Sequence, residues 1–307
     1  MHYEYAVEPQ AIASSWENFR YLIEKFGFDK GRLISQFPKS WFREVYQAAD
    51  ALSPLQKKKL EEALNKAKNN KVVRSGRNHD PSLGQWLDSA LIEHQRQPFH
   101  AIIACNTPGS DPSVLPVDTI DESEPLMKVP RGNDIQRDIS SIASALKGLL
   151  HHGTRLAFVD PYFDPFNARQ KKLFRELFRI ISDNNPGANC EVHYRKDARN
   201  LSNDVLEREA ATLFGDVIPS GMKVSFYCWC EKDKGEDFHA RYLLTEKGGI
   251  SIDAGFDPVG SQETTDFTLM DNDLVLRRLA AISRDANVYE LIEPIVAISS
   301  DGTVEEI

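Results

Sequence analysis

The chain lacks the features of several common classes of protein. In its 307 residues no apolar run approaches the ~18 residues that a membrane-spanning helix requires. The first residues, Met-His-Tyr-Glu-Tyr, have neither the basic start nor the apolar core of a secretory signal. No internal repeat and no low-complexity tract is evident. Together with 41% hydrophobic and 27% charged residues, these absences predict an ordinary soluble, cytoplasmic protein.

Cysteine is scarce as well. The four cysteines show no metal-ligand spacing, and the pair around Trp229 is one residue short of a CxxC motif. We therefore expect buried, reduced thiols, and we expect neither a metal nor another cofactor. The cysteines are Cys105, Cys190, Cys228 and Cys230.

Cations are fewer than carboxylates, and they are unevenly spread. A net charge of −9 argues against broad, non-specific binding of duplex nucleic acid by most of the surface. Residues 1–100 nevertheless carry 15 Lys and Arg against 12 Asp and Glu, and the excess lies in residues 56–77. This basic segment is either an arm that faces nucleic acid or a solvated helix face beside a polar linker. Its candidate substrate contacts are Lys57, Lys58, Lys59, Arg74 and Arg77.

Helix patterns dominate residues 1–95, which we expect to form a small all-helical domain. Apolar residues recur there at three- and four-residue steps. Ser53-Pro54 has the serine cap and the first-turn proline that typically begin a helix. A domain of this kind could bind a protein partner. The expected helices begin near Trp16, Trp41, Pro54 and Trp86.

Strand and helix patterns alternate over the rest of the chain, which we expect to form one α/β domain of residues 96–307. Such alternation implies a sheet with helices on both faces. Ligands of these sheets collect at the carboxyl ends of strands, so Asp160, which follows a strand, is a candidate ligand neighbour. The expected strands lie near residues 99–105, 155–159, 190–194, 224–229, 239–246 and 250–252. The expected helices lie near residues 135–150, 173–181, 203–214 and 274–282.

The segment of residues 238–257 combines groups that suit phosphate chemistry. It begins Phe-His-Ala-Arg-Tyr and ends Gly-Phe-Asp. Alternate side chains of an extended strand share a face, so His239 and Arg241 are predicted to point the same way, ~6 to 7 Å apart. The histidine could attack phosphorus or move protons while the arginine holds phosphate oxygens. The sequence therefore predicts a phosphate site on this strand.

The spacing His-x-Arg-x4-Glu of His239, Arg241 and Glu246 resembles the His-x-Lys-x4-Asp signature of the phospholipase D superfamily. An Asp-Pro-Tyr corner after the strand near residues 155–159 and a glycine-rich hairpin fit the same order. From about residue 98 to 298 the chain is similar to a single phospholipase D-like domain. The variant resembles the degenerate domain found at the C-terminus of MIT-domain proteins and in bacterial relatives.

The resemblance implies a mixed α/β sheet flanked by helices and a metal-independent phosphodiesterase. Carried onto this chain, His239 would form a phosphohistidine, Arg241 would clamp the phosphate and Glu246 would take the carboxylate position. Asp266 is the candidate that orients the imidazole. Because the chain has one copy of the motif, two His239 sites would have to meet in a symmetric homodimer. The candidate substrate contacts of this domain are Asp160, Tyr162 and Asp257.

Three classes of function stay open. The first is a nuclease whose basic segment guides the substrate, which the bacterial relatives would place in defence against foreign DNA. The second is a catalytically degenerate module that binds nucleic acid or phospholipid phosphate without turnover. Arg241 in the lysine position and Phe256 in place of the Ser/Asn pair suit such a module, because arginine holds phosphate in a planar, bidentate way. In the third, His239 and Arg241 only pair with Glu246 or Asp266 in a buried network.

Overall fold

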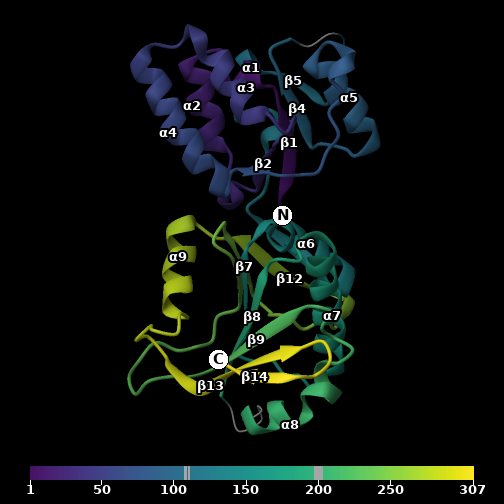
Figure 1. The fold of residues 1–307 in the computed structure, drawn as a ribbon, viewed down its shortest axis with the longest axis vertical. Coiled ribbons are helices and arrows are strands. Elements are labelled where there is room, and N and C mark those ends of the chain that lie inside the picture. The colour runs from purple at the N-terminus through teal and green to yellow at the C-terminus, as the bar shows by residue number, and fades with distance from the viewer. Residues whose placement is uncertain (107–108, 110, 197–202) are drawn as a thin grey trace. The chain divides into compact units, whose positions relative to one another are not determined.

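The described part of the chain folds as two compact units (Figure 1). The computed structural model describes residues 1–106, 109, 111–196 and 203–307. The N-terminal unit is His2–Arg131, and the C-terminal unit is Gly132–Ile307 together with Met1. The boundary expected between residues 95 and 96 is wrong, because residues 96–131 pack with the N-terminal part of the chain.

Among its described residues the N-terminal unit holds a five-stranded parallel sheet, so the expected all-helical domain is wrong. The strand order is β3-β2-β1-β4-β5. The predicted helices are present, but they lie between strands that are too short to show a periodicity of their own. The strands are β1 (Tyr3–Val7), β2 (Arg32–Ser35), β3 (Val72–Val73), β4 (Ala101–Ala104) and β5 (Val114–Pro116). The helices are α1 (Pro9–Ala13), α2 (Trp16–Lys25), α3 (Trp41–Ala48), α4 (Pro54–Asn70) and α5 (Trp86–Arg96). Short 3-10 helices are η1 (Phe28–Lys30), η2 (Ala49–Ala51), η3 (Pro81–Leu83), η4 (Val117–Thr119) and η5 (Pro125–Met127).

Side chains of β1 alternate between two buried layers. Tyr5 and Val7 pack in one apolar cluster with residues of α1 to α4. Ala6, between them, packs in a second cluster with Leu87 and Ala90 of α5. Helices therefore cover both faces, as a parallel sheet requires.

Two of the predicted helix starts have side-chain caps. The Ser15 hydroxyl accepts a hydrogen bond from the Asn18 N–H at 3.0 Å, and α2 begins at the next residue. Ser53 and Gln56 exchange the two hydrogen bonds of a capping box at the start of α4. These caps satisfy N–H groups that a helix start otherwise leaves unpaired.

The C-terminal unit contains nine strands in the part of the chain that the structure describes, in the order β14-β13-β9-β8-β7-β10-β11-β12-β6. β7, β8 and β9 are parallel, and β10 returns antiparallel beside β7. The expected α/β class is confirmed, while the phospholipase D-like arrangement stays a prediction. The strands are β6 (Gly132–Arg137), β7 (Arg155–Val159), β8 (Asn189–Arg195), β9 (Lys223–Cys230), β10 (Tyr242–Leu244), β11 (Gly249–Ile252), β12 (Gly260–Leu269), β13 (Glu290–Ser299) and β14 (Val304–Glu306). The helices are α6 (Ile139–His152), α7 (Ala168–Asn184), α8 (Asn203–Phe214) and α9 (Asn272–Ala281).

Helices cover both faces of this sheet too (Figure 1). Phe158 of β7 packs against Phe174 and Phe178 of α7 with ring centres 5.5 and 5.9 Å apart. Its neighbour Val159 packs in a cluster with Val275 of α9. Because side chains of β7 alternate between the two helical layers, loops from both layers meet at the carboxyl ends of β7 to β9.

The helix expected from residue 135 begins later. Ile135 belongs to the edge strand β6, and α6 starts at Ile139. Asp138 sets this start, because its carboxylate accepts a hydrogen bond from the Ser141 N–H at 2.9 Å.

Candidate functional site

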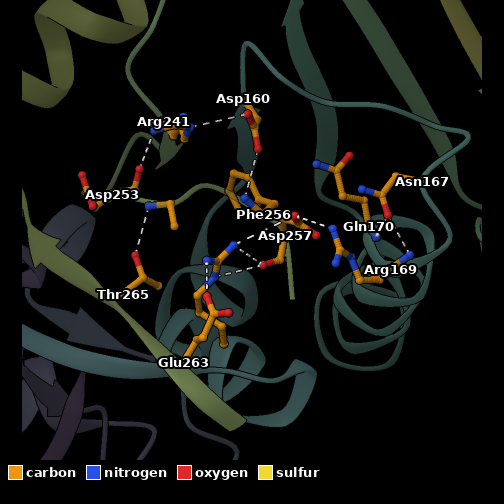
Figure 2. A network of polar contacts seen from close by, with 12 residues as sticks. Asp160, Asn167, Arg169, Gln170, Arg241, Asp253, Phe256, Asp257, Glu263 and Thr265 are labelled. Atoms are coloured by element: carbon orange, nitrogen blue, oxygen red, sulfur yellow. Dashed lines mark hydrogen bonds and ion pairs between the residues drawn. The ribbon is translucent and has the colours of Figure 1, made fainter. Parts of the chain in front are cut away.

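A polar cluster lies where β7 and β8 end and β10 begins. The parallel pairing brings Asp160, directly after β7, to the same edge as Arg195 at the end of β8. β10 runs the other way and pairs Tyr242 with Val159, so Arg241 lies opposite Asp160. We call Asp160, Tyr162, Arg195 and Arg241 the strand-end cluster (Figure 2, in which Asp160 and Arg241 are labelled).

Asp160 is the buried member of this cluster. It is 2% exposed, and its carboxylate accepts hydrogen bonds from the N–H groups of Tyr162 and Phe256, both at 3.0 Å. Burial raises the pKa of Asp160, and the two N–H donors and Arg241 oppose that rise. The Arg241 Nε lies 3.9 Å from the Asp160 Oδ1. A buried carboxylate with two backbone donors is thus fixed beside a guanidinium.

Arg241 is positioned by groups on three sides. Its Nη1 donates to the carbonyl of Asp253, and its Cζ lies 4.7 Å from the centre of the Tyr162 ring. Gly255 approaches from the hairpin. A Cβ there would lie 2.6 Å from the Asp160 Oδ2 and 2.7 Å from the Arg241 Cδ. The cluster therefore holds the arginine in a defined place and leaves its outer side open.

A second guanidinium lies on the same tyrosine ring. The Arg195 Cζ is 5.2 Å from the centre of the Tyr162 ring, which is 47% exposed. Glu231, just after β9, accepts from the Arg195 Nη1 at 3.3 Å and from the Phe238 N–H at 3.0 Å. Glu231 thereby ties the segment that leads into Arg241 to the end of β8. The two guanidiniums share one exposed ring.

His239 does not join Arg241 on one face of a strand. β10 begins only at Tyr242, and His239 is an exposed residue of the irregular segment before it. It lines a cavity of about 110 Å³ together with Val159 and Leu244, which pack toward α9. Asp160, in contrast, bonds to Phe256, which packs toward α7. The predicted common face is wrong, and no described residue forms a hydrogen bond or ion pair with the imidazole.

Glu246 lies at the wrong end of β10 for a role beside Asp160. Its carboxylate accepts from the N–H groups of Thr154 and Arg155, at the start of β7, at 3.0 and 3.1 Å. Thr154 precedes Asp160 by six positions, with the five residues of β7 between them, which corresponds to ~20 Å. Glu246 therefore caps the start of β7, and its predicted place in the site is wrong.

Asp266 does not orient the histidine either. It is exposed on β12, and its backbone carbonyl accepts from the Asp253 N–H at 3.1 Å. The neighbouring Thr265 points inward and accepts from the Ala254 N–H at 3.0 Å. The alternative of a buried network with Glu246 or Asp266 is also wrong, because the carboxylate beside Arg241 is Asp160.

Asp257 lies near the cluster but is committed to arginines. Its Oδ2 accepts from the Arg169 Nη2 at 3.0 Å, and its backbone carbonyl accepts from the Arg137 Nη2 at 3.0 Å (Figure 2). It follows Phe256, whose N–H binds Asp160. Asp257 thus joins the strand-end cluster to the first turn of α7.

The basic segment predicted to contact substrate belongs to the N-terminal unit and divides into two kinds of residue. Arg77 is buried: it pairs with Glu4 at 3.1 Å and lies 3.9 Å above the Phe99 ring, so its predicted substrate contact is wrong. Lys57 pairs with Asp50 at 3.0 Å at the start of α4. The remaining candidates, Lys58, Lys59 and Arg74, are exposed.

Two groups of candidate functional residues were not predicted from the sequence. One is Arg195, a basic residue that directly follows an apolar strand run and could have been found by that position. The other is a cationic face of α7, for which the signal was available. Residues 169–179 contain five cations and the single carboxylate Glu176. The cations are Arg169, Lys171, Lys172, Arg175 and Arg179.

Neither a metal centre nor a membrane span is found in the described residues. Within these residues no three or more His, Cys, Asp and Glu side chains are grouped so that they could hold a metal ion. No described helix is long and apolar enough to cross a membrane.

No family model and no curated protein matches the chain. Among solved structures it is similar to TrmBL2, an archaeal chromatin protein whose structure is described as showing a novel mode of DNA binding. The identity is 11% and the TM-score 0.27, over 79% of this chain and 67% of that chain. A likeness this slight supports no inference about fold or function.

Proposed function

We propose that the C-terminal unit binds phosphate groups of a nucleic acid at the strand-end cluster. The observation that carries the proposal is that Arg195 and Arg241 lie on one exposed tyrosine ring, at the sheet edge where ligands of α/β folds collect. This is the non-catalytic alternative of the functions that the sequence suggests.

The donors of Arg241 suit a phosphate. A guanidinium presents N–H groups in a planar fork that matches two phosphate oxygens. Nη1 is used by the Asp253 carbonyl, while no described residue accepts a hydrogen bond from Nη2. The buried Asp160 holds the guanidinium in place without covering it. An arriving phosphate therefore meets a donor whose position is already fixed, which lowers the entropic cost of binding.

Exposed aromatic rings favour nucleic acid over a phospholipid head group. Tyr162 and Phe166 are 47% and 57% exposed, and both belong to the loop between β7 and α7. Bases of single strands stack on such rings whatever their sequence. A lipid head group would use the arginines but offers no base to stack. The pairing of rings with guanidiniums is thus the arrangement expected for a single-stranded nucleic acid.

The direct test is binding of a fluorescein-labelled single-stranded oligonucleotide, measured by anisotropy. Arg241→Gln removes the charge and should weaken binding by about 10- to 100-fold, the usual worth of a charge-assisted hydrogen bond. Arg277→Gln is the matched control, because Arg277 is exposed on α9 and has no described partner. Equal affinity of both variants would contradict the proposal. Binding to phosphatidylserine vesicles in place of the oligonucleotide would identify a lipid ligand instead.

A second candidate, hydrolysis of a phosphodiester, is favoured by one observation. His239 is an exposed imidazole, and no described residue forms a hydrogen bond with its ring nitrogens. Attack on phosphorus would form a P–N bond and break a P–O bond. The leaving oxygen would take a proton from His239 of a second copy, and water would then release the phosphate. This proposal requires the two histidines to meet in a dimer.

Turnover in excess EDTA tests the second candidate. Wild type and His239→Ala are compared on a chromogenic diester, single-stranded DNA, duplex DNA and RNA. Turnover that persists in EDTA and is lost in the variant would establish the enzyme. If wild type shows no turnover and His239→Ala binds the oligonucleotide as tightly as wild type, only the binding function remains.

A further inference from the structure

Positive charge is concentrated on one helix of an otherwise acidic unit. Residues 132–307 carry 20 Lys and Arg against 29 Asp and Glu, a net of −9, whereas residues 169–179 within them carry a net of +4. Arg169, Lys172, Arg175 and Arg179 line a single cavity of about 670 Å³, and we call them the α7 basic face. From the first to the last of them α7 rises ~15 Å.

The cavity is lined by a fifth cation and by two carboxylates, those of Asp138 and Glu176. Arg137, at the end of β6, lines it together with the first turn of α6 and residues 258–260. Asp138 already caps α6, since its carboxylate accepts from the N–H and the hydroxyl of Ser141. The attraction of this cavity for an anion therefore comes from side chains and not from a free helix terminus.

The carboxylate partners of the α7 basic face are replaceable. Arg175 pairs with Asp216, and Arg179 pairs with Asp183 and with Glu176 of α7 itself. The side chains of these residues are roughly half exposed or more, except that of Glu176, which is 33% exposed. Exposed ion pairs of this kind contribute little to stability, because both ions are well solvated when apart. Lys172 is exposed and has no described partner. Phosphates could displace these carboxylates without disturbing the fold.

The α7 basic face is linked to the strand-end cluster by contacts that run through the buried Asp160 and Phe256. Arg169 binds Asp257 at 3.0 Å, and the preceding residue, Phe256, binds Asp160 at 3.0 Å (Figure 2). Phe166, 57% exposed, lies on the same loop as Tyr162 and three residues before Arg169. A chain of contacts thus leads from the arginine pair to the start of α7.

We propose that a single-stranded nucleic acid bound at the strand-end cluster continues along the α7 basic face, with successive phosphates beside its cations. The proposal rests on the proposed function and adds the polymeric nature of the ligand and its path. An acidic peptide would also meet the cations of α7. It would leave the exposed rings of Tyr162 and Phe166 without stacking partners, so the observations favour the nucleic acid.

Binding of a short and a long oligonucleotide tests this proposal separately from the proposed function on which it rests. Labelled oligothymidylates of about 4 and about 16 nucleotides span the usual range of single-strand sites. The variant Lys172→Gln/Arg175→Gln/Arg179→Gln should bind the long oligomer at least tenfold more weakly and the short one within twofold of wild type. Its plot of log affinity against log salt for the long oligomer should flatten by about two units, because three phosphate contacts are lost at ~0.7 each.

The control variant removes three exposed cations from other elements of the same unit: Arg208→Gln/Lys223→Gln/Arg277→Gln. Its affinity for the oligomers should match that of wild type, apart from the small loss that any reduction in positive charge causes. Circular dichroism and thermal unfolding check that both triple variants are folded, as expected for exposed positions.

Each outcome is decisive. Loss of long-oligomer binding in the α7 variant alone, with Arg241→Gln weakening both oligomers, supports the path. Unchanged long-oligomer binding in the α7 variant overturns the path but leaves the proposed function standing. If Arg241→Gln binds both oligomers as tightly as wild type does, the proposed function itself is wrong. Tighter binding of oligoglutamate than of the long oligomer would overturn the path in favour of an acidic peptide.

Discussion

Among single residues, Gly255 sets how closely the two charged groups of the cluster approach. Its φ of 72° is in the left-handed region, which side chains disfavour. A Cβ at this position would also meet both Asp160 and Arg241 at less than 3 Å. The glycine-rich hairpin noted in the sequence therefore lets the hairpin backbone pass beside the buried Asp160 and the partly exposed Arg241.

Gly255→Ala is expected to lower the free energy of unfolding by about 2 to 3 kcal/mol, from the strained φ and the displaced Asp160 side chain. Oligonucleotide affinity should fall with it, because Arg241 moves. Urea unfolding and anisotropy measure the two effects. Gly187→Ala is the control: its Cβ would meet nothing within 4 Å and its φ is ordinary, so stability should change by less than about 0.5 kcal/mol. Equal effects of the two substitutions would refute the account of Gly255.

How far single residues could be predicted depends on what fixes their position. Asp160 could be placed near a ligand, because it follows a strand and strand ends meet at one edge. Arg195 could not be paired with Tyr162, because that contact depends on β8 being the neighbour of β7. The sequence misplaces His239, because its pattern predicts a strand that begins three residues before Tyr242 and side-chain alternation holds only inside a strand.

At the level of elements, helices could be predicted better than strands. Helices such as α4 and α7 show several turns of apolar periodicity, and serine or asparagine caps mark their starts. β1, β2 and β3 have five, four and two residues, too few for a period to be recognised. Their pairing is long-range, and the remaining strands of the sheet, β4 and β5, lie beyond the domain boundary that the sequence predicts.

The start of β7 provides a test of the corrected role of Glu246. Its carboxylate accepts hydrogen bonds from the N–H groups of Thr154 and Arg155, which lie before Ala157, the first β7 residue that pairs with β10. Glu246→Gln weakens these bonds and should cost about 0.5 to 1.5 kcal/mol in urea unfolding. Oligonucleotide affinity and any EDTA-resistant turnover should stay at the wild-type level. A large loss of either at unchanged stability would restore Glu246 to the site.

The carboxyl end of α6 makes stability depend on pH. Burial lowers the pKa of His151 and of His152 to about 4, from 6.5 in the unfolded chain. Burial also lowers the pKa of His193, against the opposing effect of Glu191. Below pH 6.5 the unfolded chain binds protons that the fold excludes, so stability is full above about pH 6.5 and declines toward pH 4.

Urea midpoints at pH 7.5 and pH 5 measure this dependence. The midpoint should be lower at pH 5. In His152→Gln, which cannot take up a proton, the difference between the two midpoints should be smaller. A midpoint that stays constant or rises on acidification would contradict the assignment of buried, neutral histidines.

At the scale of the whole molecule, the two units differ in charge. Residues 1–131 carry 17 Lys and Arg against 17 Asp and Glu, so the entire net charge of −9 belongs to residues 132–307. We expect most of the second unit to repel a polyanion, and the strand-end cluster and the α7 basic face to attract it. Binding should therefore be local and strongly salt-dependent.

The most direct measurement of the central claim is a double-mutant cycle on single-stranded oligonucleotide binding. Wild type, Arg195→Gln, Arg241→Gln and the double variant are compared by anisotropy at one salt concentration. If both guanidiniums hold the same phosphate, each single variant should lose about tenfold or more, and the double variant should lose less than the product of the two. Wild-type affinity in both single variants would contradict a phosphate site at the ends of these strands.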